Sequence, residues 1–365
     1  MAKKLDYHQS VNYSQADPMK VLAQKQGLAT AGNMPFGFEE VVGTRGESAY
    51  VFQMDGQWGA FVQEGLGTKS LVAQVLYEKT GKSHFAAIAQ DTVACIINDL
   101  ISVGAQPVVL NAYWSSSSYD WLTDHQLAED FIKGWRAACD LAGVVWGGGE
   151  TQSLPGLVET GKLEFAGSGF GVIKSAKHLV QGKNLSSGDA IVLIESSGVH
   201  ANGISLVREV ADQLSDGYAT KLADGSNFGE AVLTPTHIYA ALVQALQAAE
   251  LDIHYLSNIT GHGWRKLMRA VPDFSYVMTL VPPVPEVFNF IAERSGNDLA
   301  EMYGNFNMGA GYAVYLPAEQ SQQAITVATK LGLKAWDAGR VEAGAKQVVI
   351  KPEDIIFAAD SLEVR

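Results

Sequence analysis

The chain has 365 residues, of which 47% are hydrophobic and 18% are charged, and its formal net charge at pH 7 is −13. This length is more than one hydrophobic core usually organises, so we expect two domains. The acidic balance argues against a nucleic-acid partner or an anionic membrane surface. No apolar run reaches the roughly 18 residues that a membrane-spanning helix needs.

Residues 1–47 are polar and rich in glycine, and they predict an irregular N-terminal arm. The first ten residues, MAKKLDYHQS, have no apolar core after their lysines, so we expect no signal peptide. The two cysteines, Cys95 and Cys139, form no CxxC pair and fall in helical patterns. This cysteine usage fits a reducing, cytoplasmic compartment.

Residues 48–174 predict a first domain of strands and helices. Two alternating strands, Tyr50–Met54 and Trp58–Gln63, are joined by Asp55-Gly56, a strong hairpin signal. The other predicted elements are helices at Leu71–Thr80, Asp91–Gly104 and Thr123–Leu141, and strands at Pro107–Tyr113, Val144–Trp146 and Phe165–Ile173.

The segment Asp91–Gly104 reads as a helix that is apolar on nearly all sides, which is typical of a buried helix. Asp91 and Asn98 are seven residues apart and fall on one line of it, with Asp99 one step to the side. Buried carboxylates are usually paired or bound to a metal. Two interpretations remain open: Asp91 caps the helix while Asn98 and Asp99 bond to backbone, or the group holds Mg²⁺ together with substrate phosphates.

Two glycine-rich segments follow predicted strands. The segment FVQEGLGTKS, 61–70, places Glu64 and Lys69 around two glycines; it is not a Walker A loop, but it suits either a phosphate site or a tight turn. In Gly147–Thr151, Glu150 is expected to project from a glycine turn at a sheet edge, where most such turns are only structural. The first domain thus offers four candidate metal ligands: Glu64, Asp91, Asp99 and Glu150.

After a polar boundary segment, Lys174–Asp189, the pattern restarts as a second domain, residues 175–365. The predicted elements are strands at Ala190–Glu195, Ala310–Leu316 and Gln347–Ile350, and helices at about Gly203–Leu214 and Pro235–Ala249. The segment SSGVHANG, 196–203, offers His200 and Asn202 near a helix N-terminus. This placement suits anion binding, although capping by Asn202 beside a surface histidine explains it equally well.

Taken in order, the motifs resemble those of the phosphoribosylformylglycinamidine cyclo-ligase family, the aminoimidazole ribonucleotide synthetases of purine biosynthesis. The matching segments are Glu64–Lys69, Asp91 with Asn98-Asp99-Leu100, Gly148–Thr151, Ser196–Gly203, Leu233–Tyr239 and Met302–Gly311. Six motifs in one order make the resemblance specific. It implies an α/β (α+β) fold of two domains, in which an N-terminal strand domain forms a homodimer and a C-terminal α/β domain packs on it.

The resemblance also implies the chemistry. ATP with Mg²⁺ would phosphorylate the formyl oxygen of formylglycinamidine ribonucleotide, and an amidine nitrogen would then close the imidazole ring, releasing ADP and phosphate. It assigns the metal to Glu64, Asp91, Asp99 and Glu150. It assigns nucleotide binding to Gly65, Gly67, Thr68, Lys69, Asn98, Gly148, Gly149 and Thr151. It assigns catalytic roles to Lys69, His200 and Asn202, and we add His262 as a catalytic candidate on separate grounds.

This sequence departs from the family pattern at two single residues and in the glycine loop expected before the first strand, which is reduced to Gly32–Phe38. Glu64 stands where the family has an aspartate, and Asn258 stands where the family has a histidine. We hypothesise that His262, four residues later, supplies the missing imidazole. These changes leave two alternatives open: another ATP-dependent enzyme of the same superfamily with a different acceptor, or a non-catalytic nucleotide-binding paralogue.

Overall fold

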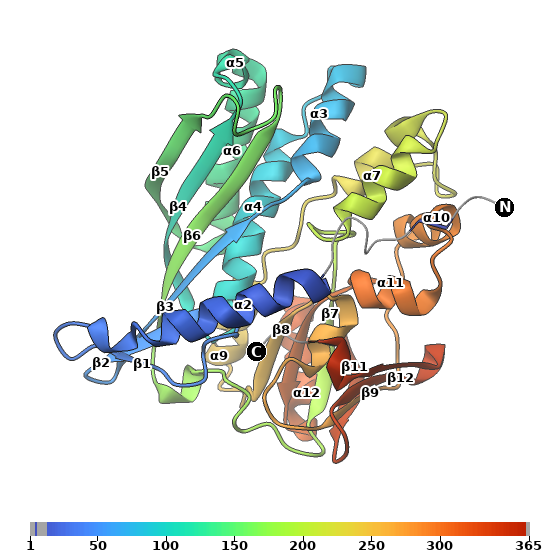
Figure 1. The fold of residues 1–365 in the computed structure, drawn as a ribbon. Helices are drawn as coiled ribbons and strands as arrows, with labels where there is room; N and C mark the ends of the chain where they lie inside the picture. Colours follow the sequence, from blue (N-terminus) through green and yellow to red (C-terminus); the bar gives the residue numbers. More distant parts are fainter. Residues whose placement is uncertain (1–3, 6–12, 363–365) are drawn as a thin grey trace.

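The computed structural model describes residues 4–5 and 13–362, and it contains two sheets with helices packed around each (Figure 1). The prediction of an irregular arm is wrong over α2 (Tyr13–Leu28), which is a helix and crosses in front of the junction between the two halves in this view. A single 3-10 turn, Ala31–Asn33, follows it. The placement of domain boundaries after residues 47 and 174 stays a prediction.

The first sheet has six strands in the order β1-β2-β3-β6-β4-β5. Its strands are β1 (Glu39–Glu40), β2 (Tyr50–Met54), β3 (Gln57–Gly65), β4 (Gln106–Ser116), β5 (Val145–Ser153) and β6 (Leu163–Ile173). The predicted hairpin is confirmed, because β2 pairs antiparallel with β3 across Asp55 (φ 50°) and Gly56 (φ 76°), two left-handed residues as a two-residue turn requires. Only β4 and β5 pair in parallel within this sheet.

Helices cover one face of this sheet (Figure 1). They are α3 (Lys69–Thr80), α4 (Phe85–Ile101), the short α5 (Asp120–Thr123) and α6 (His125–Ala142). The α6 helix begins where Asp124 accepts hydrogen bonds from the backbone N–H groups of Gln126 and Leu127, at 3.1 and 3.2 Å. Such a cap satisfies donors that the first helical turn leaves unpaired.

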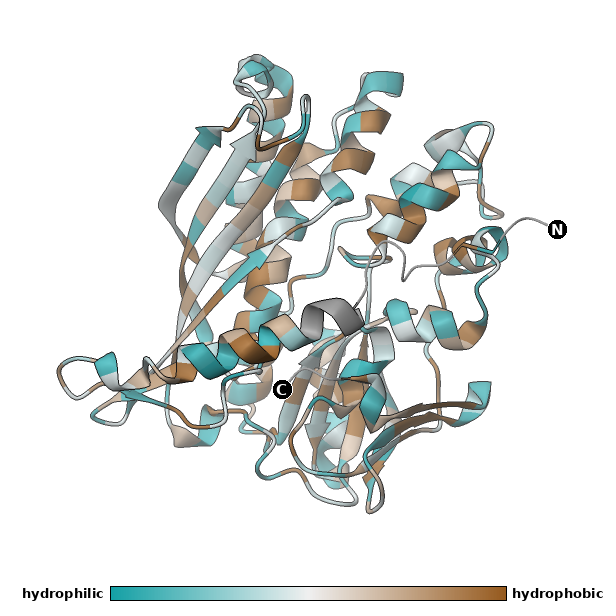
Figure 2. Ribbon diagram, in the orientation of Figure 1, coloured by the Kyte–Doolittle hydropathy of each residue, from teal (hydrophilic) through white to brown (hydrophobic). Residues whose placement is uncertain are grey.

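The central helix α4 begins at Phe85, six residues earlier than expected, so Asp91 lies inside it rather than at its N-cap. Its apolar side chains are buried as predicted, and Figure 2 shows the helix as largely hydrophobic. It approaches β6 closely: a β-carbon at Gly167 or Gly169 would come within 2.9 or 2.8 Å of the Ile96 side chain. Any larger residue at either glycine would push α4 off the sheet.

The predicted glycine turn at Gly147–Thr151 is wrong. These residues continue the strand, so β5 extends from Val145 to Ser153 alongside β4, with one irregularity in the register at Gly147. Glycines are poor strand formers, but pairing with the long strand β4 supplies the hydrogen bonds that hold the segment extended. Glu150 is therefore an exposed residue of an edge strand and not the tip of a turn.

The second sheet has seven strands in the order β13-β12-β9-β11-β7-β10-β8. The strands are β7 (Ala190–Glu195), β8 (Tyr255–Asn258), β9 (Ser275–Met278), β10 (Ala310–Leu316), β11 (Ala335–Glu342), β12 (Gln347–Ile350) and β13 (Ile355–Ala358). Every residue of β10, which lies between β7 and β8, is buried, and this burial explains its unbroken apolar character. Among the described strands of this second sheet, β9 and β12 are the one parallel pair.

Six helices accompany this sheet within the described part of the chain. They are α7 (Ile204–Asp212), α8 (Phe228–Val232), α9 (Ala240–Ala248), α10 (Glu286–Ser295), α11 (Leu299–Asn305) and α12 (Ser321–Lys330). The helix predicted from Pro235 begins only at Ala240, because side chains of α4 form hydrogen bonds with the backbone of residues 234–239 and hold it outside the helix. Across residues 4–5 and 13–362, the helices are too short or too polar to cross a bilayer.

A histidine near the base of the second sheet gives a pH-dependent contribution to stability. The His254 Nδ1 lies 2.7 Å from Asp189 and its Nε2 lies 3.3 Å from Asp252, and the bond to Asp189 is the main cause of a raised His254 pKa. Because the folded pKa is raised, this stabilisation is present below the unfolded pKa and is lost as pH rises through the folded value. We expect His254→Gln to flatten the fall in unfolding free energy between pH 6 and pH 8, as measured by urea denaturation. An unchanged pH dependence would contradict this assignment.

Candidate functional site

A cavity of about 340 Å³ lies where the first half of the chain meets the second. Its first-half wall is the end of β3, the turn after it and one side of α4. Its second-half wall is the turn before α7 and the end of β8. The lining residues are Glu64, Gly65, Leu66, Gly67, Thr68, Cys95, Asp99, Ala201, Asn202, Gly203, Ile204, Ser205, Asn258 and Thr260.

The turn after β3 has a conformation that its local sequence favours. The backbone N–H of Leu66 donates to the Phe165 carbonyl at 2.8 Å, and this bond holds the end of the strand against β6. Gly67 then adopts φ 75°, a left-handed conformation that favours glycine. Thr68 follows, and α3 begins at Lys69. The turn therefore presents backbone and a hydroxyl group to the cavity immediately before a helix N-terminus, where anions are favoured.

Two carboxylates, Glu64 and Asp99, line the cavity. Burial is the main cause of a rise in the pKa of Glu64 to about 7, and the nearby Asp99 carboxylate contributes to this rise. Lys266 and Arg269 partly offset it. Asp99 accepts a 2.7 Å hydrogen bond from the Asn258 side-chain amide. The pair is thus two repelling carboxylates that a cation would stabilise together.

The pair fits Mg²⁺. No group of three or more His, Cys, Asp or Glu side chains within metal-binding reach occurs in the described ranges. Mg²⁺ sites that also bind nucleotides usually need only one or two carboxylates, because phosphates and water supply the other ligands. Glu64 and Asp99 meet that requirement, and the extra methylene of Glu64 still leaves its carboxylate on the cavity wall.

Lys266, which lies behind the cavity wall, is not among the site residues predicted from the sequence. The Lys266 Nζ donates to the Thr260 hydroxyl group, and Thr260 lines the cavity. Burial lowers the pKa of Lys266 to about 8, against the opposing effect of Asp99. The sequence carried little signal for this residue, since it lies in a 3-10 segment, Gly263–Met268, that the pattern does not reveal.

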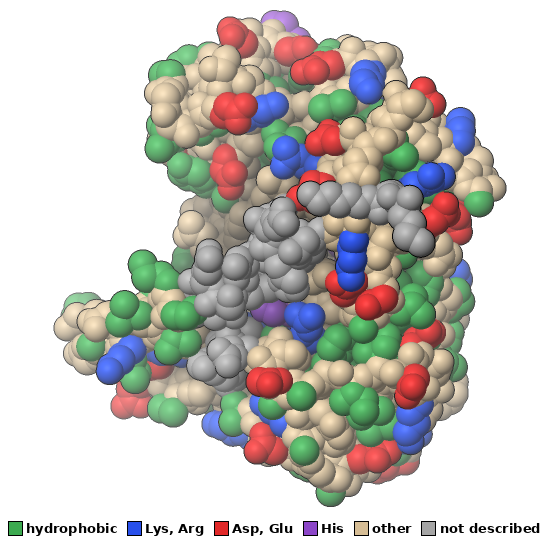
Figure 3. Space-filling view, turned by 45° about the vertical axis from the view of Figure 1, so that its right-hand side comes forward, with side chains coloured by type: hydrophobic (Ala, Val, Ile, Leu, Met, Phe, Trp, Pro, Cys, Tyr) green, Lys and Arg blue, Asp and Glu red, His purple; other side chains and the backbone are tan. Residues whose placement is uncertain are grey.

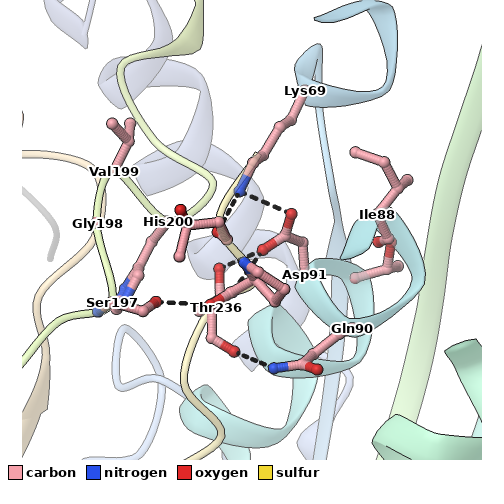
Figure 4. Close-up of polar contacts among 12 residues, drawn as sticks. Lys69, Ile88, Gln90, Asp91, Ser197, Gly198, Val199, His200 and Thr236 are labelled. Atoms are coloured by element: carbon pink, nitrogen blue, oxygen red, sulfur yellow. Dashed lines mark hydrogen bonds and ion pairs between the residues drawn. The ribbon is translucent and has the colours of Figure 1, made fainter. Parts of the chain in front are cut away.

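Lys69 and Asp91 form a buried ion pair away from the cavity (Figure 4). The Lys69 Nζ lies 2.7 Å from Asp91 Oδ2, and neither side chain is exposed to solvent. The other carboxylate oxygen accepts from the backbone N–H and the hydroxyl group of Thr236, at 2.8 and 2.5 Å. Lys69 also donates to the Thr234 carbonyl at 3.3 Å. In this arrangement Asp91 is committed to protein groups, and the structure does not bring it to the candidate metal site.

Asn98 likewise binds the segment 234–239. Its side chain donates to the His237 carbonyl at 2.8 Å and accepts from the Tyr239 N–H at 2.9 Å. One residue before Asp91, on the same helix, Gln90 donates to the Thr236 carbonyl at 2.9 Å. We call these three α4 side chains, Gln90, Asp91 and Asn98, the α4 clamp. They join the two halves of the chain, a role that neither sequence interpretation included.

The predicted histidines do not line the cavity. His200 is buried behind it and accepts from the Ser197 backbone N–H at 3.2 Å (Figure 4). Burial lowers the His200 pKa well below its usual value, so the ring is neutral. His262 is buried at a left-handed position, φ 68°, and is also absent from the lining. Asn258 itself occupies the cavity wall, so the arrangement does not support the hypothesis that His262 replaces an imidazole there.

The structure thus divides the predicted site residues into three groups. On the cavity are Glu64, Gly65, Gly67, Thr68, Asp99 and Asn202. Buried behind it are Lys69, Asp91, Asn98, His200 and His262. On the exposed edge strand β5, and not among the lining residues, are Gly148, Gly149, Glu150 and Thr151.

Comparison with known proteins gives matches over most of the chain. Residues 46–173 match the family described as AIR synthase related protein, N-terminal domain, and residues 186–351 match its C-terminal domain. A phosphoribosylformylglycinamidine cyclo-ligase of Carboxydothermus hydrogenoformans is 34% identical over 292 residues, which is 79% of this chain and 81% of that protein. The enzyme of the same name from Methanothermobacter thermautotrophicus is 31% identical and covers 86% and 88%.

Solved structures share the fold at low identity. The E. coli hydrogenase maturation protein HypE aligns with a TM-score of 0.59 at 17% identity, covering 83% of this chain and 85% of that one. T. maritima PurL complexed with FGAR aligns with a TM-score of 0.59 at 16% identity, covering 88% and 48%. The predicted two-domain α/β architecture is confirmed by these matches. The chain belongs to the AIR synthase related family, with both its N-terminal and its C-terminal domain present.

Proposed function

We propose that this protein is an ATP-dependent ligase that closes the ring of formylglycinamidine ribonucleotide to give aminoimidazole ribonucleotide, with ADP and phosphate released. Curated relatives with this name match about four fifths of the chain at 31–34% identity. The observation that carries the proposal is the cavity, in which Glu64 and Asp99 face the glycine turn that precedes α3. Such a site provides what phosphoryl transfer requires: cation ligands beside a phosphate-binding turn.

The lining residues suggest how the site works. Glu64 and Asp99 would hold Mg²⁺, which supplies charge stabilisation to the phosphates of bound ATP. The backbone of Gly65 and Gly67 and the hydroxyl group of Thr68 would orient those phosphates. Asn202 would contact the acceptor from the second half of the chain.

The buried residues take positioning roles in this proposal. Lys69 follows directly on the phosphate-binding turn and is fixed by Asp91, so the ion pair holds the start of α3 in place. Asn258 donates to Asp99 and would keep that carboxylate aimed at the cavity. We also propose a cytoplasmic location, as expected for a biosynthetic enzyme that acts on a phosphorylated nucleotide.

The test is substrate-dependent ADP release. With Mg-ATP and formylglycinamidine ribonucleotide, we expect ADP to form in step with aminoimidazole ribonucleotide, and only background ADP release without the acceptor. A folded protein that binds Mg-ATP but shows no stimulation would overturn the cyclo-ligase assignment. It would favour another acceptor within the superfamily, or a nucleotide-binding protein without turnover.

We infer that the protein forms a homodimer through the open face of the first sheet. Helices α3, α4 and α6 cover the other face (Figure 1), whereas Phe61, Val145 and Val172 point outward and are 44%, 65% and 39% exposed. Apolar side chains gathered on one sheet face are typical of an association surface. On the face of the molecule in Figure 3, acidic and basic side chains are interspersed and form no extended basic patch of the kind that binds nucleic acid.

We expect light scattering to give a molar mass of about twice 39.1 kDa for the native protein. Phe61→Lys together with Val172→Lys should halve this mass, because two charges would be buried at the interface. Ile132→Lys is the matched control, since Ile132 is 42% exposed but lies on α6, behind the sheet. A native monomer, or a dimer that survives the double substitution, would contradict this interface.

A further inference from the structure

A second cavity, of about 240 Å³, lies between α3 and the segment that runs from α7 into the 3-10 turn Gly217–Ala219. It shares no lining residue with the first cavity. One wall belongs to the first half of the chain and the other to the second, so this space also lies at the junction of the two domains (Figure 1). The proposed reaction assigns no role to the residues that line this second cavity.

Three cations converge on this cavity: Lys79 from α3, Lys162 from the turn before β6, and Arg208 from α7. Asp212 is the single carboxylate in the lining, four residues after Arg208 on the same helix, yet the two form no ion pair. In the described part of the chain, none of the three cations has a carboxylate partner. This excess of positive charge is local, because the protein as a whole carries a net charge of −13.

Two of the three cations are partly buried, whereas Lys79 is exposed. Lys162 and Arg208 are half-buried, and an unpaired cation that is partly removed from water is unfavourable without an anion. Lys79 reaches across to the second half, since its Nζ lies 3.3 Å from the position that a β-carbon would take at Gly217. The floor between them is formed by apolar side chains, including Leu71 and the buried ring of Tyr218.

We propose that this second cavity is a binding site for the phosphate group of a small phosphorylated molecule. Three unpaired cations on separate elements match the charge of a phosphate monoester and can reach its oxygens from several directions. The apolar floor leaves room for the organic part of such a molecule beside the phosphate. The site uses none of the residues assigned to ATP or Mg²⁺, so its binding of phosphate can be tested apart from the proposed reaction.

The two cavities are close neighbours along the same two helices. Ser205 lines the first and Arg208 the second, one turn apart on α7; Thr68 and Leu71 have the same relation at the start of α3. An anion between α3 and α7 would therefore fix the two helices whose N-terminal ends border the first cavity. The bound phosphate is either the 5′-phosphate of the ribonucleotide substrate or that of a separate molecule.

The site can be tested without turnover, by titrating ribose 5-phosphate and, separately, inorganic phosphate into the full chain in a calorimeter. We expect binding by the native protein and at least about tenfold weaker binding by the double variant Arg208→Gln, Lys162→Gln, since each loses a charge-assisted contact. The control variant Lys133→Gln, Arg136→Gln removes the same charge from the exposed surface of α6 and should bind normally. Thermal unfolding confirms that each variant is folded.

Steady-state kinetics then identify the source of the phosphate. A raised KM for formylglycinamidine ribonucleotide, with the KM for ATP unchanged, would place the substrate's own phosphate in the cavity. Unchanged KM values, with a response to added ribose 5-phosphate that the Arg208→Gln, Lys162→Gln variant loses, would indicate a separate ligand. Absence of binding by the native protein, or equal binding by that variant, would overturn the site, whatever the outcome of the ADP-release assay.

Discussion

Replacing Asp91 by alanine is expected to lower the free energy of unfolding by about 3–5 kcal/mol, because it leaves the Lys69 ammonium group buried without its partner. Neither side chain of this pair is exposed, and the Nζ–Oδ2 distance is 2.7 Å. The substitution also removes the acceptor for the Thr236 N–H, which is itself buried. Urea denaturation followed by circular dichroism measures the change.

Two further variants show whether the cost comes from the unpaired charge. Adding Lys69→Met to Asp91→Ala removes the orphaned ammonium group, and we expect part of the lost stability to return. Glu129→Ala breaks an exposed pair with Lys133, at 2.6 Å on the surface of α6, and should leave stability unchanged within error. If Asp91→Ala behaved like Glu129→Ala, the buried pair would have no structural importance.

Asp99→Asn is expected to reduce kcat/KM for the ring-closing reaction on the order of 100-fold, because it removes one of two carboxylates proposed to hold Mg²⁺. The shape of the side chain is kept, and the Asn258 amide can still donate to the remaining carbonyl oxygen. We therefore expect the protein to fold normally. The concentration of Mg²⁺ that gives half-maximal rate should rise, and Glu64→Gln should act in the same direction.

Glu150→Gln is the matched control for both substitutions. Glu150 belongs to the same half of the chain and to a family motif, but the structure places it on the exposed strand β5, away from the cavity lining. We expect its kinetic constants and Mg²⁺ dependence to equal those of the native protein. A large effect at Glu150 with none at Asp99 would mean that the metal site has been placed on the wrong carboxylates.

Local patterns predicted most of the fold. The Asp55-Gly56 hairpin, the buried strand Ala310–Leu316 and the apolar helix around Ile96 depend on turn chemistry and periodicity, which are visible within a few residues. The misplaced boundaries have a non-local cause. The strand β5 keeps its glycines extended through pairing with β4, and residues 234–239 stay outside α9 because α4 side chains bond their backbone.

The site could be predicted only in part, because some of its residues are placed by local patterns and others by non-local contacts. Glu64, Gly67 and Asp99 reach the cavity because the strand end and helix that carry them face it directly. Asp91 shares a motif with Asp99, but its partners, Lys69 and Thr236, come from other parts of the chain. Spacing along a helix predicts the direction of a side chain but not which groups of the folded protein surround it. Lys266 received no role in the predicted site, because no periodic pattern marks a 3-10 segment.

The α4 clamp also determines how the protein unfolds. Gln90, Asp91 and Asn98 donate to or accept from the backbone of residues 234–239; Asp91 and Asn98 are buried and Gln90 is half-buried. Neither half can unfold first without breaking these hydrogen bonds and exposing the contact surface of the other half. The two segments that match separate domain families therefore form one cooperative unit, and heat or denaturant should melt them in a single transition.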